Sequence, residues 1–291
     1  MENRLIIIDS NALLHRAFHA LPPLANSSGQ ETGAVYGYLL TLFKAIKDLS
    51  PNYIVACFDT KAKTFRHEQF QDYKAQRPVT PSGIIFQIPI TKDVLKAFGV
   101  PVFFKDGFEA DDLIATICDL TQKQNKNLEI YILTGDLDNL QLVNEKIKVY
   151  TLGKGIKDTI IYDINKVEER FGVKPEQMVD FKALTGDPSD NIPGVEGIGK
   201  KTAAEIIQKY GTIKNLYEEL STDTAVLKPK VKEALQKNKE TALMSLGLVK
   251  MKNDVEIFFN IEDCKFGKFN KIEVENIFKK LDFNSLISRI P

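Results

Sequence analysis

The amino-acid sequence predicts an α/β fold in which a mostly parallel central sheet, flanked by helices, is followed by a C-terminal helical subdomain. In the first half, short apolar runs alternate with segments of helical periodicity, and strands separated by helices form parallel sheets through right-handed crossovers. After about residue 172, helical segments dominate. The 291 residues suffice for one large domain or two modest ones. We therefore expect a core at 1–172 and a helical subdomain at 173–291.

The individual elements follow from the spacing of apolar residues. Short apolar runs bounded by polar residues are typical of buried strands. They predict strands at 5–8, 53–58, 100–104 and 129–133. Apolar residues that recur every three or four positions predict helices. In the core these lie at 11–20, 33–49 and 109–124, and beyond it at 175–184, 200–210, 213–220 and 229–249.

The composition excludes several classes of protein. Hydrophobic residues make up 43% of the chain and charged residues 27%, which is globular rather than disordered composition. The 39 basic and 39 acidic residues give a net charge of zero, which argues against a globally basic nucleic-acid coat protein. No apolar run reaches the roughly 18 residues of a membrane span, and no signal peptide precedes the first strand. The three scattered cysteines form no disulfide framework, so we expect a cytoplasmic protein.

Acidic residues follow the predicted strands where a parallel sheet places its functional site. Asp9, Asp59 and Asp136 stand at or just past the ends of three strands, and ligands of open α/β sheets bind beyond those ends. Each residue has a second interpretation, because a short acidic side chain also caps the N-terminus of a helix. The acidic residues are also concentrated, since residues 105–140 hold eight acids and three lysines.

Two further acidic groups stand at helix ends. Glu109, Asp111 and Asp112 open a predicted helix, where they could equally complement the helix dipole. Asp187 and Asp190 follow another helix. If these clusters meet at one sheet edge, each close pair would repel by roughly 1 kcal/mol in water and roughly 4 kcal/mol at an effective dielectric of 20. Such repulsion rivals the stability of a domain, about 5–15 kcal/mol, so cations must neutralise the cluster. Oxygen ligands suit Mg²⁺ or Mn²⁺, and two such ions catalyse phosphodiester hydrolysis.

Other catalytic arrangements are weakly represented. The sequence has no GxSxG nucleophile elbow and no Walker A lysine loop. His15 and His19 are four residues apart but lack the HExxH spacing of a zinc protease, so a packing or capping role fits them better.

A glycine-rich loop at 194–199 lies between two predicted helices and is followed by Lys200, Lys201 and Thr202. Glycine allows close backbone approach, and the free N–H groups of the next helix attract phosphate. A simple capping loop is the alternative. The combination of helix, Gly-x-x-Gly-x-Gly and a Lys-Lys-Thr-Ala helix start favours sequence-independent binding to the backbone of a duplex.

The segment 60–82 is polar, basic and too long for an ordinary connection. Its five basic residues interleave with Phe65, Phe70 and Tyr73, so that aromatic rings could stack on bases of a single strand while cations follow its phosphates. A solvated amphipathic helix is the alternative. Because the segment follows Asp59 directly, we expect it to form an arch over the acidic edge.

Taken together, these segments resemble the 5′ nuclease of bacterial DNA polymerase I, within the flap endonuclease superfamily. The resemblance spans nearly the whole chain. It is carried by LIIIDSNALLHRAF at 5–18, FDTKAKTFRHEQFQDYKAQRP at 58–78, FEADDLIA at 108–115, LTGDLDNLQLV at 133–143 and ALTGDPSDNIPGVEGIGKKTA at 183–203. It implies a PIN-like nuclease core and a helix–hairpin–helix at about 183–210.

The resemblance also implies roles for individual residues. The first metal cluster is matched by Asp9, Asp59, Glu109, Asp111 and Asp112, and the second by Asp136, Asp138, Asp187 and Asp190. The arch cations, which draw the scissile phosphate to the metals, are matched by Arg66, Lys74 and Arg77. Arg16 matches a phosphate-facing position and Tyr73 one beside the terminal bases. The duplex-gripping hairpin is matched by Gly194, Gly197, Ile198, Gly199, Lys200, Lys201 and Thr202. One departure is Leu137, where the family commonly has lysine.

The implied activity is metal-dependent cutting of DNA with a 5′ flap, nick or overhang, and of RNA primers, in Okazaki-fragment processing and repair. We expect two Mg²⁺ ions, replaceable by Mn²⁺, and K⁺ at the hairpin. The protein would be a nucleoid-associated bacterial monomer, with a DNA polymerase in the same or another chain as its partner. A non-catalytic DNA-junction binder and a PIN-like ribonuclease are the alternatives.

Overall fold

The computed structural model describes residues 3–153 and 158–291, so residues 1–2 and 154–157 of the predicted core lie outside the described residues. A single sheet has the strand order β3-β2-β1-β4-β5-β6. All neighbouring pairs are parallel except β5 and β6, which are antiparallel. The strands are β1 (Arg4–Asp9), β2 (Tyr53–Cys57), β3 (Val102–Phe103), β4 (Glu129–Leu133), β5 (Ile147–Leu152) and β6 (Thr159–Tyr162). The four predicted strands are present, and β5 and β6 are additional.

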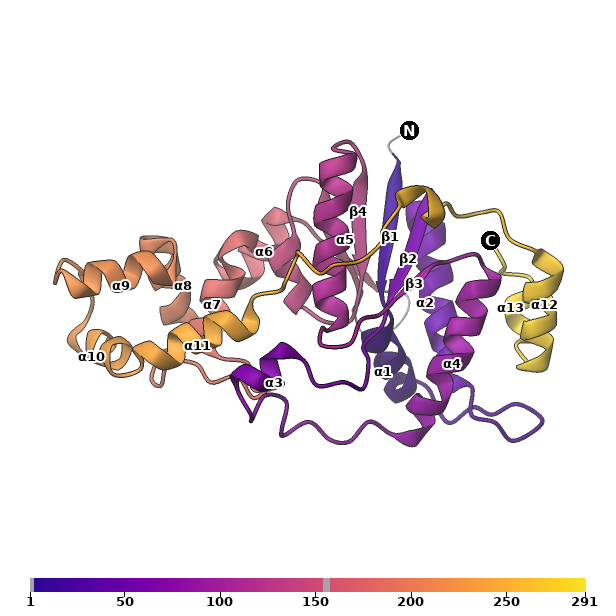
Figure 1. Cartoon of the computed structure of the whole chain (residues 1–291), viewed down its shortest axis with the longest axis horizontal. Coiled ribbons are helices and arrows are strands. Elements are labelled where there is room, and N and C mark those ends of the chain that lie inside the picture. The colour runs from indigo at the N-terminus through magenta and orange to yellow at the C-terminus, as the bar shows by residue number, and fades with distance from the viewer. Residues whose placement is uncertain (1–2, 154–157) are drawn as a thin grey trace.

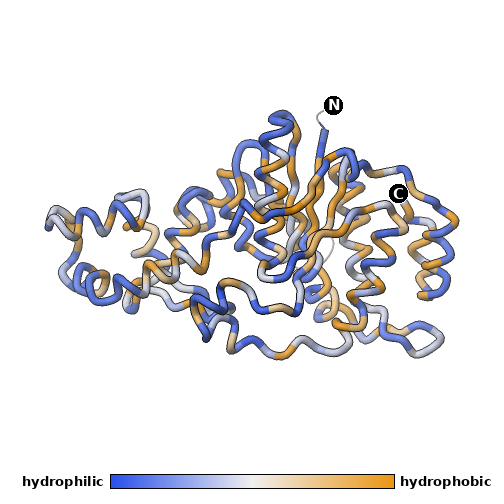
Figure 2. Tube along the Cα trace, in the orientation of Figure 1, coloured by the Kyte–Doolittle hydropathy of each residue, from blue (hydrophilic) through white to orange (hydrophobic). Residues whose placement is uncertain are grey.

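The central strands are apolar on both faces because helices cover both faces of the sheet. Leu5 and Ile7 of β1 pack on one side with α5 (Ala110–Gln124), whereas Ile6 and Ile8 pack on the other. Figure 2 shows the apolar strands at the centre and polar residues on the outer surfaces of the helices. The second face is covered by α1 (Ser10–Ala20), α2 (Gly33–Leu49) and α4 (Ser82–Ala97).

Figure 1 shows a second, all-helical lobe beside the sheet. After α6 (Ile164–Phe171), it comprises the 3₁₀ turn η2 (Pro175–Gln177), α7 (Met178–Thr185), α8 (Lys200–Tyr210), α9 (Ile213–Ser221), α10 (Pro229–Lys237) and α11 (Lys239–Val249). The single helix predicted at 229–249 is therefore two helices, which meet at Asn238.

The last part of the chain leaves this lobe and returns to the sheet (Figure 1). After η3 (Ile261–Cys264), α12 (Lys271–Lys280) and α13 (Asn284–Ile287) pack on the same face as α2 and α4. Phe278 contacts the rings of Phe43 and Phe98. The helical subdomain predicted at 173–291 is therefore too long, because burial of the apolar face of α12 joins that helix to the core.

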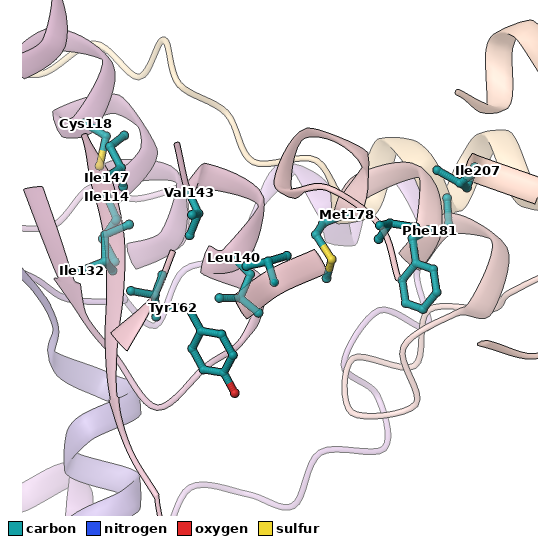
Figure 3. Packing of buried hydrophobic residues seen from close by; sticks show 14 of the residues in the cluster. Ile114, Cys118, Ile132, Leu140, Val143, Ile147, Tyr162, Met178, Phe181 and Ile207 are labelled. Atoms are coloured by element: carbon teal, nitrogen blue, oxygen red, sulfur yellow. The ribbon is translucent and has the colours of Figure 1, made fainter. Parts of the chain in front are cut away.

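One hydrophobic core joins the sheet to the helical lobe. It runs from Ile114 of α5 and Ile132 of β4 through Leu140 to Met178 and Phe181 of α7 (Figure 3). Leu140 lies on η1 (Asp138–Leu142), a 3₁₀ turn that follows β4. Among the described residues, no helix is long and apolar enough to cross a membrane.

The strand order fixes where a site can form. The chain leaves β1 toward β2 on one side and later returns to β4 on the other side of β1. Such a reversal opens a crevice beyond the carboxyl ends of the strands. Figure 1 shows α3 (Phe65–Gln69) and the chain after it passing this end of the sheet, beside α1.

Candidate active site

Carboxylates from separate segments line a hollow of about 600 Å³ beyond the strand ends. Asp9 ends β1, Asp59 follows β2 by two residues, and Asp136 follows β4 by three. Glu109 and Asp111 reach the hollow from the start of α5, and Asp190 from the loop after α7. The predicted convergence of acidic residues on one sheet edge is therefore present in the structure.

A second hollow of about 890 Å³, the outer cleft, adjoins the first, and Asp136 and Arg77 line both. It also contains Arg16, Asp138, Lys182, Asp187 and Lys200. The predicted second cluster is thus divided, because Asp190 faces the first hollow whereas Asp138 and Asp187 face the outer cleft.

Several of these carboxylates also accept local hydrogen bonds, so the capping interpretation holds for them as well. Asp9 caps α1 through Ala12 N at 3.1 Å, and its other oxygen accepts from the Thr134 hydroxyl at 2.6 Å. Asp59 accepts from Ala110 N, at the start of α5, at 2.7 Å. These bonds orient the carboxylates, and each oxygen retains a lone pair for a cation.

Burial and mutual repulsion raise the pKa values of the central carboxylates. Burial is the main cause for Asp9, whose pKa rises to about 6 with a contribution from Asp59. Burial also raises the pKa of Asp111 well above its ordinary value, and the charges of Asp9 and Asp136 add to this. For Asp138, burial and Asp136 raise the pKa to about 7 despite a contact with Lys182.

Lysine and arginine side chains neutralise part of this charge. Lys74 Nζ lies 2.6 Å from Glu109 Oε1, and Arg77 pairs with Asp190. Lys74 has a left-handed backbone (φ 56°), a conformation that costs a non-glycine residue about 1–3 kcal/mol and is concentrated at functional sites. Two of the three predicted arch cations, Lys74 and Arg77, therefore reach the acidic hollow.

Lys182 of α7 also contacts the acidic residues, although it was not among the residues predicted from the sequence. Its Nζ contacts Asp138 and lies 2.8 Å from Asp187 Oδ2. Burial alone would lower the pKa of Lys182, but the two carboxylates raise it. The sequence feature that could have indicated Lys182 is its position on a predicted helix, five residues before Asp187. Leu137, in contrast, packs against the hydrophobic core.

Asp112 does not line the acidic hollow, unlike the other residues predicted for the first metal cluster. Asp112 is 0% exposed. Its two oxygens accept from Arg66 at 2.8 and 2.9 Å, from Glu109 N at 3.1 Å and from Lys252 N at 2.8 Å. A carboxylate has about four lone-pair sites, and these donors occupy all of them.

The placement of Arg66 also differs from the prediction. The residue is 2% exposed, and besides Asp112 it donates to the carbonyl oxygens of Leu248 and Lys250. Its guanidinium therefore connects α3, α5 and the end of α11, and faces no solvent-filled hollow. In this structure Arg66 therefore bridges these elements and does not line the acidic hollow.

Tyr73 differs in a similar way. It is 3% exposed and packs with Ile192 and Leu248. Its hydroxyl lies 3.1 Å from Glu109 Oε2 and 3.0 Å from Asp190 Oδ2, and it can donate to either carboxylate. Burial and the two carboxylates raise the pKa of Tyr73. In this structure its ring cannot stack on a base, and the segment 60–82 is folded onto the acidic edge instead of standing clear of it.

The residues of the predicted hairpin have different environments. Gly194 packs directly on Gly186, where a Cβ atom would meet backbone atoms at 2.5 Å. Ile198 is buried in the core, so its side chain packs the loop and is not available to DNA. Gly197 (φ 83°) and Gly199 are open, and exposed Lys200 and Lys201 with half-buried Thr202 begin α8.

The carboxylates are not yet arranged as a coordination shell. Within residues 3–153 and 158–291, no three His, Cys, Asp or Glu side chains are grouped so that they could hold a metal ion as placed. The donors nevertheless fit a hard divalent cation, because they are all oxygens and several are buried beside like charges. For such an ion to bind, Glu109 and Asp190 would have to exchange their Lys74 and Arg77 partners for it.

The metal-free protein should lose stability as the pH rises from about 5 to about 7.5. Folded Asp9 and Asp138 titrate at about 6 and about 7, whereas unfolded aspartate ionises near pH 4. The folded state therefore binds more protons in this window, and stability falls as they leave. The pKa of Asp187 is lowered, because the positive charge of Lys182 outweighs the effect of burial. Its ionisation therefore changes the stability only at a lower pH than this window.

Thermal unfolding at constant ionic strength, with and without Mg²⁺, measures this dependence. Mg²⁺ should raise the melting temperature most at the upper end of the range, because it binds ionised carboxylates. A melting temperature of the metal-free protein that increases from pH 5 to 7.5 would contradict the prediction.

The sheet, its acidic edge and the helical lobe define a nuclease-like architecture, and comparison with known families agrees. Residues 4–172 match the model of the 5′-3′ exonuclease N-terminal resolvase-like domain. Residues 173–272 match that of the 5′-3′ exonuclease C-terminal SAM fold. The chain belongs to the 5′-3′ exonuclease family.

Curated relatives are much longer proteins. The chain is 36% identical over 290 residues to DNA polymerase I of Bacillus caldotenax, with 100% of this chain and 32% of the relative covered. For DNA polymerase I of Bacillus subtilis (strain 168), identity is 37% over 287 residues, with 99% and 32% covered. The chain thus spans about a third of the length of the curated relatives that it matches.

Solved structures share the fold at lower identity. The phage T5 D15 protein co-crystallised with metal ions has a TM-score of 0.72 at 22% identity, with 97% of this chain and 99% of that chain covered. The catalytic core of Rad2 in complex with DNA substrate has a TM-score of 0.64 at 17% identity, with 99% and 93% covered.

Proposed function

We propose that this chain is a structure-specific 5′ nuclease that hydrolyses phosphodiester bonds at 5′ ends, flaps and nicks of DNA and in RNA primers. The observation that carries the proposal is the convergence of buried carboxylates at the strand ends, in a chain of the 5′-3′ exonuclease family. Residues 3–172 would hold the catalytic edge, and the lobe from η2 to α11 would hold the duplex.

The acidic hollow and outer cleft would hold two Mg²⁺ ions, with Mn²⁺ as a substitute. The proposed ligands are Asp9, Asp59, Glu109, Asp111, Asp136, Asp138, Asp187 and Asp190. When bound, the two ions would supply an activated water and stabilise the leaving oxygen. The saturated Asp112 is not among the ligands.

The basic residues around the two hollows would position the scissile phosphate. Lys74 and Arg77 line the acidic hollow, and Arg16 lines the outer cleft. If bound cations neutralised Glu109 and Asp190, Lys74 and Arg77 would be free to pair with phosphate oxygens, which accept such charge-assisted bonds. Their positive charge would stabilise the transition state of the in-line displacement.

The hairpin and α8 would grip unbroken duplex. The open glycines leave room for a phosphate beside the α8 N-terminus, where free N–H groups and two lysines favour an anion. Lys200 also lines the outer cleft, so the same helix adjoins the acidic site. We include K⁺, held by backbone carbonyls of the hairpin, as a proposed ligand.

The relatives support a proposal for the biological setting. Because the curated relatives are DNA polymerases I, we propose a role in processing Okazaki fragments and in repair, with a DNA polymerase in the same or another chain. The nuclease itself would act as a monomer.

A flap assay tests the proposed function. A 5′-labelled flap substrate should be cut near the junction in Mg²⁺ and remain intact in EDTA. Binding of the same DNA without cleavage in Mg²⁺ and in Mn²⁺ would instead indicate a junction-binding protein. Preference for single-stranded RNA over the flap would indicate a ribonuclease.

The double variant Lys200→Ala/Lys201→Ala should bind duplex more weakly and with a smaller salt dependence. Loss of two phosphate contacts lowers the slope of log K against log salt by about 1.8, because each contact contributes about 0.9. Duplex binding in Ca²⁺ at several salt concentrations measures the slope.

Lys279→Ala/Lys280→Ala is the matched control. These exposed lysines lie on α12, which packs on the sheet and not in the helical lobe (Figure 1), so this variant should keep the wild-type slope. An unchanged slope in the Lys200/Lys201 variant would remove the hairpin from the duplex-binding surface.

A further inference from the structure

Asn139 is a buried amide in direct contact with the acidic site. It lies on η1, immediately after Asp138, and is 0% exposed. Its Nδ2 donates to Asp111 Oδ1 at 2.8 Å. Neither its residue type nor its position marked it as a functional residue in the sequence.

The chemistry of the contact fixes the orientation of the amide. A carboxylate that binds a cation is ionised and only accepts hydrogen bonds, so the NH₂ group of Asn139 faces Asp111 in that state, as it does here. Its Oδ1 is then buried without a hydrogen-bond partner among the described residues. An unpaired buried oxygen costs free energy, whereas a leucine of similar size would cost none. Filling the core therefore does not explain an asparagine at this position, but the bond to Asp111 does.

Asp111 lies within electrostatic reach of carboxylates from both the acidic hollow and the outer cleft. Asp9, Glu109, Asp136 and Asp138 all contribute to its electrostatic environment. Asn139 is its only hydrogen-bond donor in the described part of the chain, and that bond is to Oδ1, which leaves Oδ2 without a donor. A carboxylate held through one oxygen keeps the other for a cation.

We propose that Asn139 is a positioning residue that holds Asp111 in the orientation in which it binds a divalent cation. This inference rests on the proposed function, because it requires that Asp111 be a metal ligand. Groups that hydrogen-bond to metal ligands orient them, and their loss typically weakens metal binding by about 10- to 100-fold.

Mn²⁺ binding to the full chain tests the proposal without any measurement of catalysis. Free Mn²⁺ gives a six-line electron paramagnetic resonance spectrum that broadens on binding, so a titration yields the affinity. Asn139→Leu keeps the approximate size of the side chain and removes the donor, and it should weaken Mn²⁺ binding about 10- to 100-fold. Its metal-free melting temperature should not fall, because the unpaired oxygen is also removed.

Asn144→Leu is the matched control. Asn144 follows η1, and its side chain bonds with Gln122 and with backbone N–H groups but with no carboxylate. It should lower the melting temperature and leave Mn²⁺ affinity unchanged. If Asn139→Leu does not fold, Asn139→Ser replaces it, because the serine hydroxyl is too short to reach Asp111.

The outcomes separate this inference from the proposed function. Wild-type affinity in an Asn139 variant, while wild-type protein binds Mn²⁺, would overturn the positioning role alone. Absence of Mn²⁺ binding by the wild-type protein would overturn the proposed function and this inference together. Weaker binding in the Asn139 variant, with unchanged binding in Asn144→Leu, supports the proposal.

Discussion

Replacement of Asp111 by alanine should reduce Mg²⁺-dependent cleavage of a 5′-flap substrate by at least about a thousandfold. The side chain lies at the centre of the carboxylates, within reach of the charges of Asp9, Asp136 and Asp138. Metal ions contribute several kcal/mol to the stabilisation of the transition state, and each 1.36 kcal/mol is a factor of about ten in rate. Single-turnover cleavage with excess enzyme measures the loss.

Asp119→Ala is the control for the Asp111 variant. Asp119 lies on the same helix but pairs with Lys123 on the surface, so this variant should cleave like the wild-type protein. Both variants should bind the flap in Ca²⁺. If Asp111→Ala cleaves within about tenfold of the wild-type rate, the activation free energy has risen by at most about 1.36 kcal/mol, which would exclude Asp111 as a metal ligand.

Replacement of Arg66 by methionine should lower the free energy of unfolding by about 3–5 kcal/mol, because removal of one partner leaves a buried charge uncompensated. The remaining charge is that of Asp112, which is 0% exposed and has Arg66 as its only hydrogen-bonding side chain among the described residues. Urea unfolding of the metal-free protein at pH 7 measures the change.

Two further variants separate this structural role from a catalytic one. Arg77→Met removes a cation whose side chain is 45% exposed, and surface pairs contribute only about 0–1 kcal/mol. The double variant Arg66→Met/Asp112→Leu replaces the buried pair with apolar groups and should recover much of the lost stability. Wild-type stability of Arg66→Met would return Arg66 to the solvent-facing role expected from the sequence.

The periodicity of apolar residues predicted the elements whose burial is uniform. The strand at 129–133 and the helices at 33–49 and 200–210 have the predicted bounds, because their apolar faces are unbroken. Helix α4 was missed, since it contains Pro89, which normally ends a helix. Strand β5 was missed because Lys148 interrupts its apolar residues, although in the structure that side chain pairs with Glu129.

The position of the site was predictable because residue type and topology both constrain it. An aspartate after a parallel strand must lie at the carboxyl edge, and Asp9, Asp59 and Asp136 do so. The partner of each side chain was not predictable in this way. The family resemblance grouped Asp112 with Asp111, but successive helical residues point about 100° apart. Asp112 therefore faces Arg66 and the interior, and only tertiary packing reveals this pairing.

The continuous core beneath η1 has a consequence for where the chain would cut. Because Leu140, Met178 and Phe181 pack in one cluster, the hairpin cannot slide relative to the carboxylates without breaking that core. The distance between the loop at 194–199, the proposed duplex-binding loop, and the acidic hollow is therefore constant. We expect the cut to be measured in nucleotides from the edge of the held duplex, independent of flap length and base sequence.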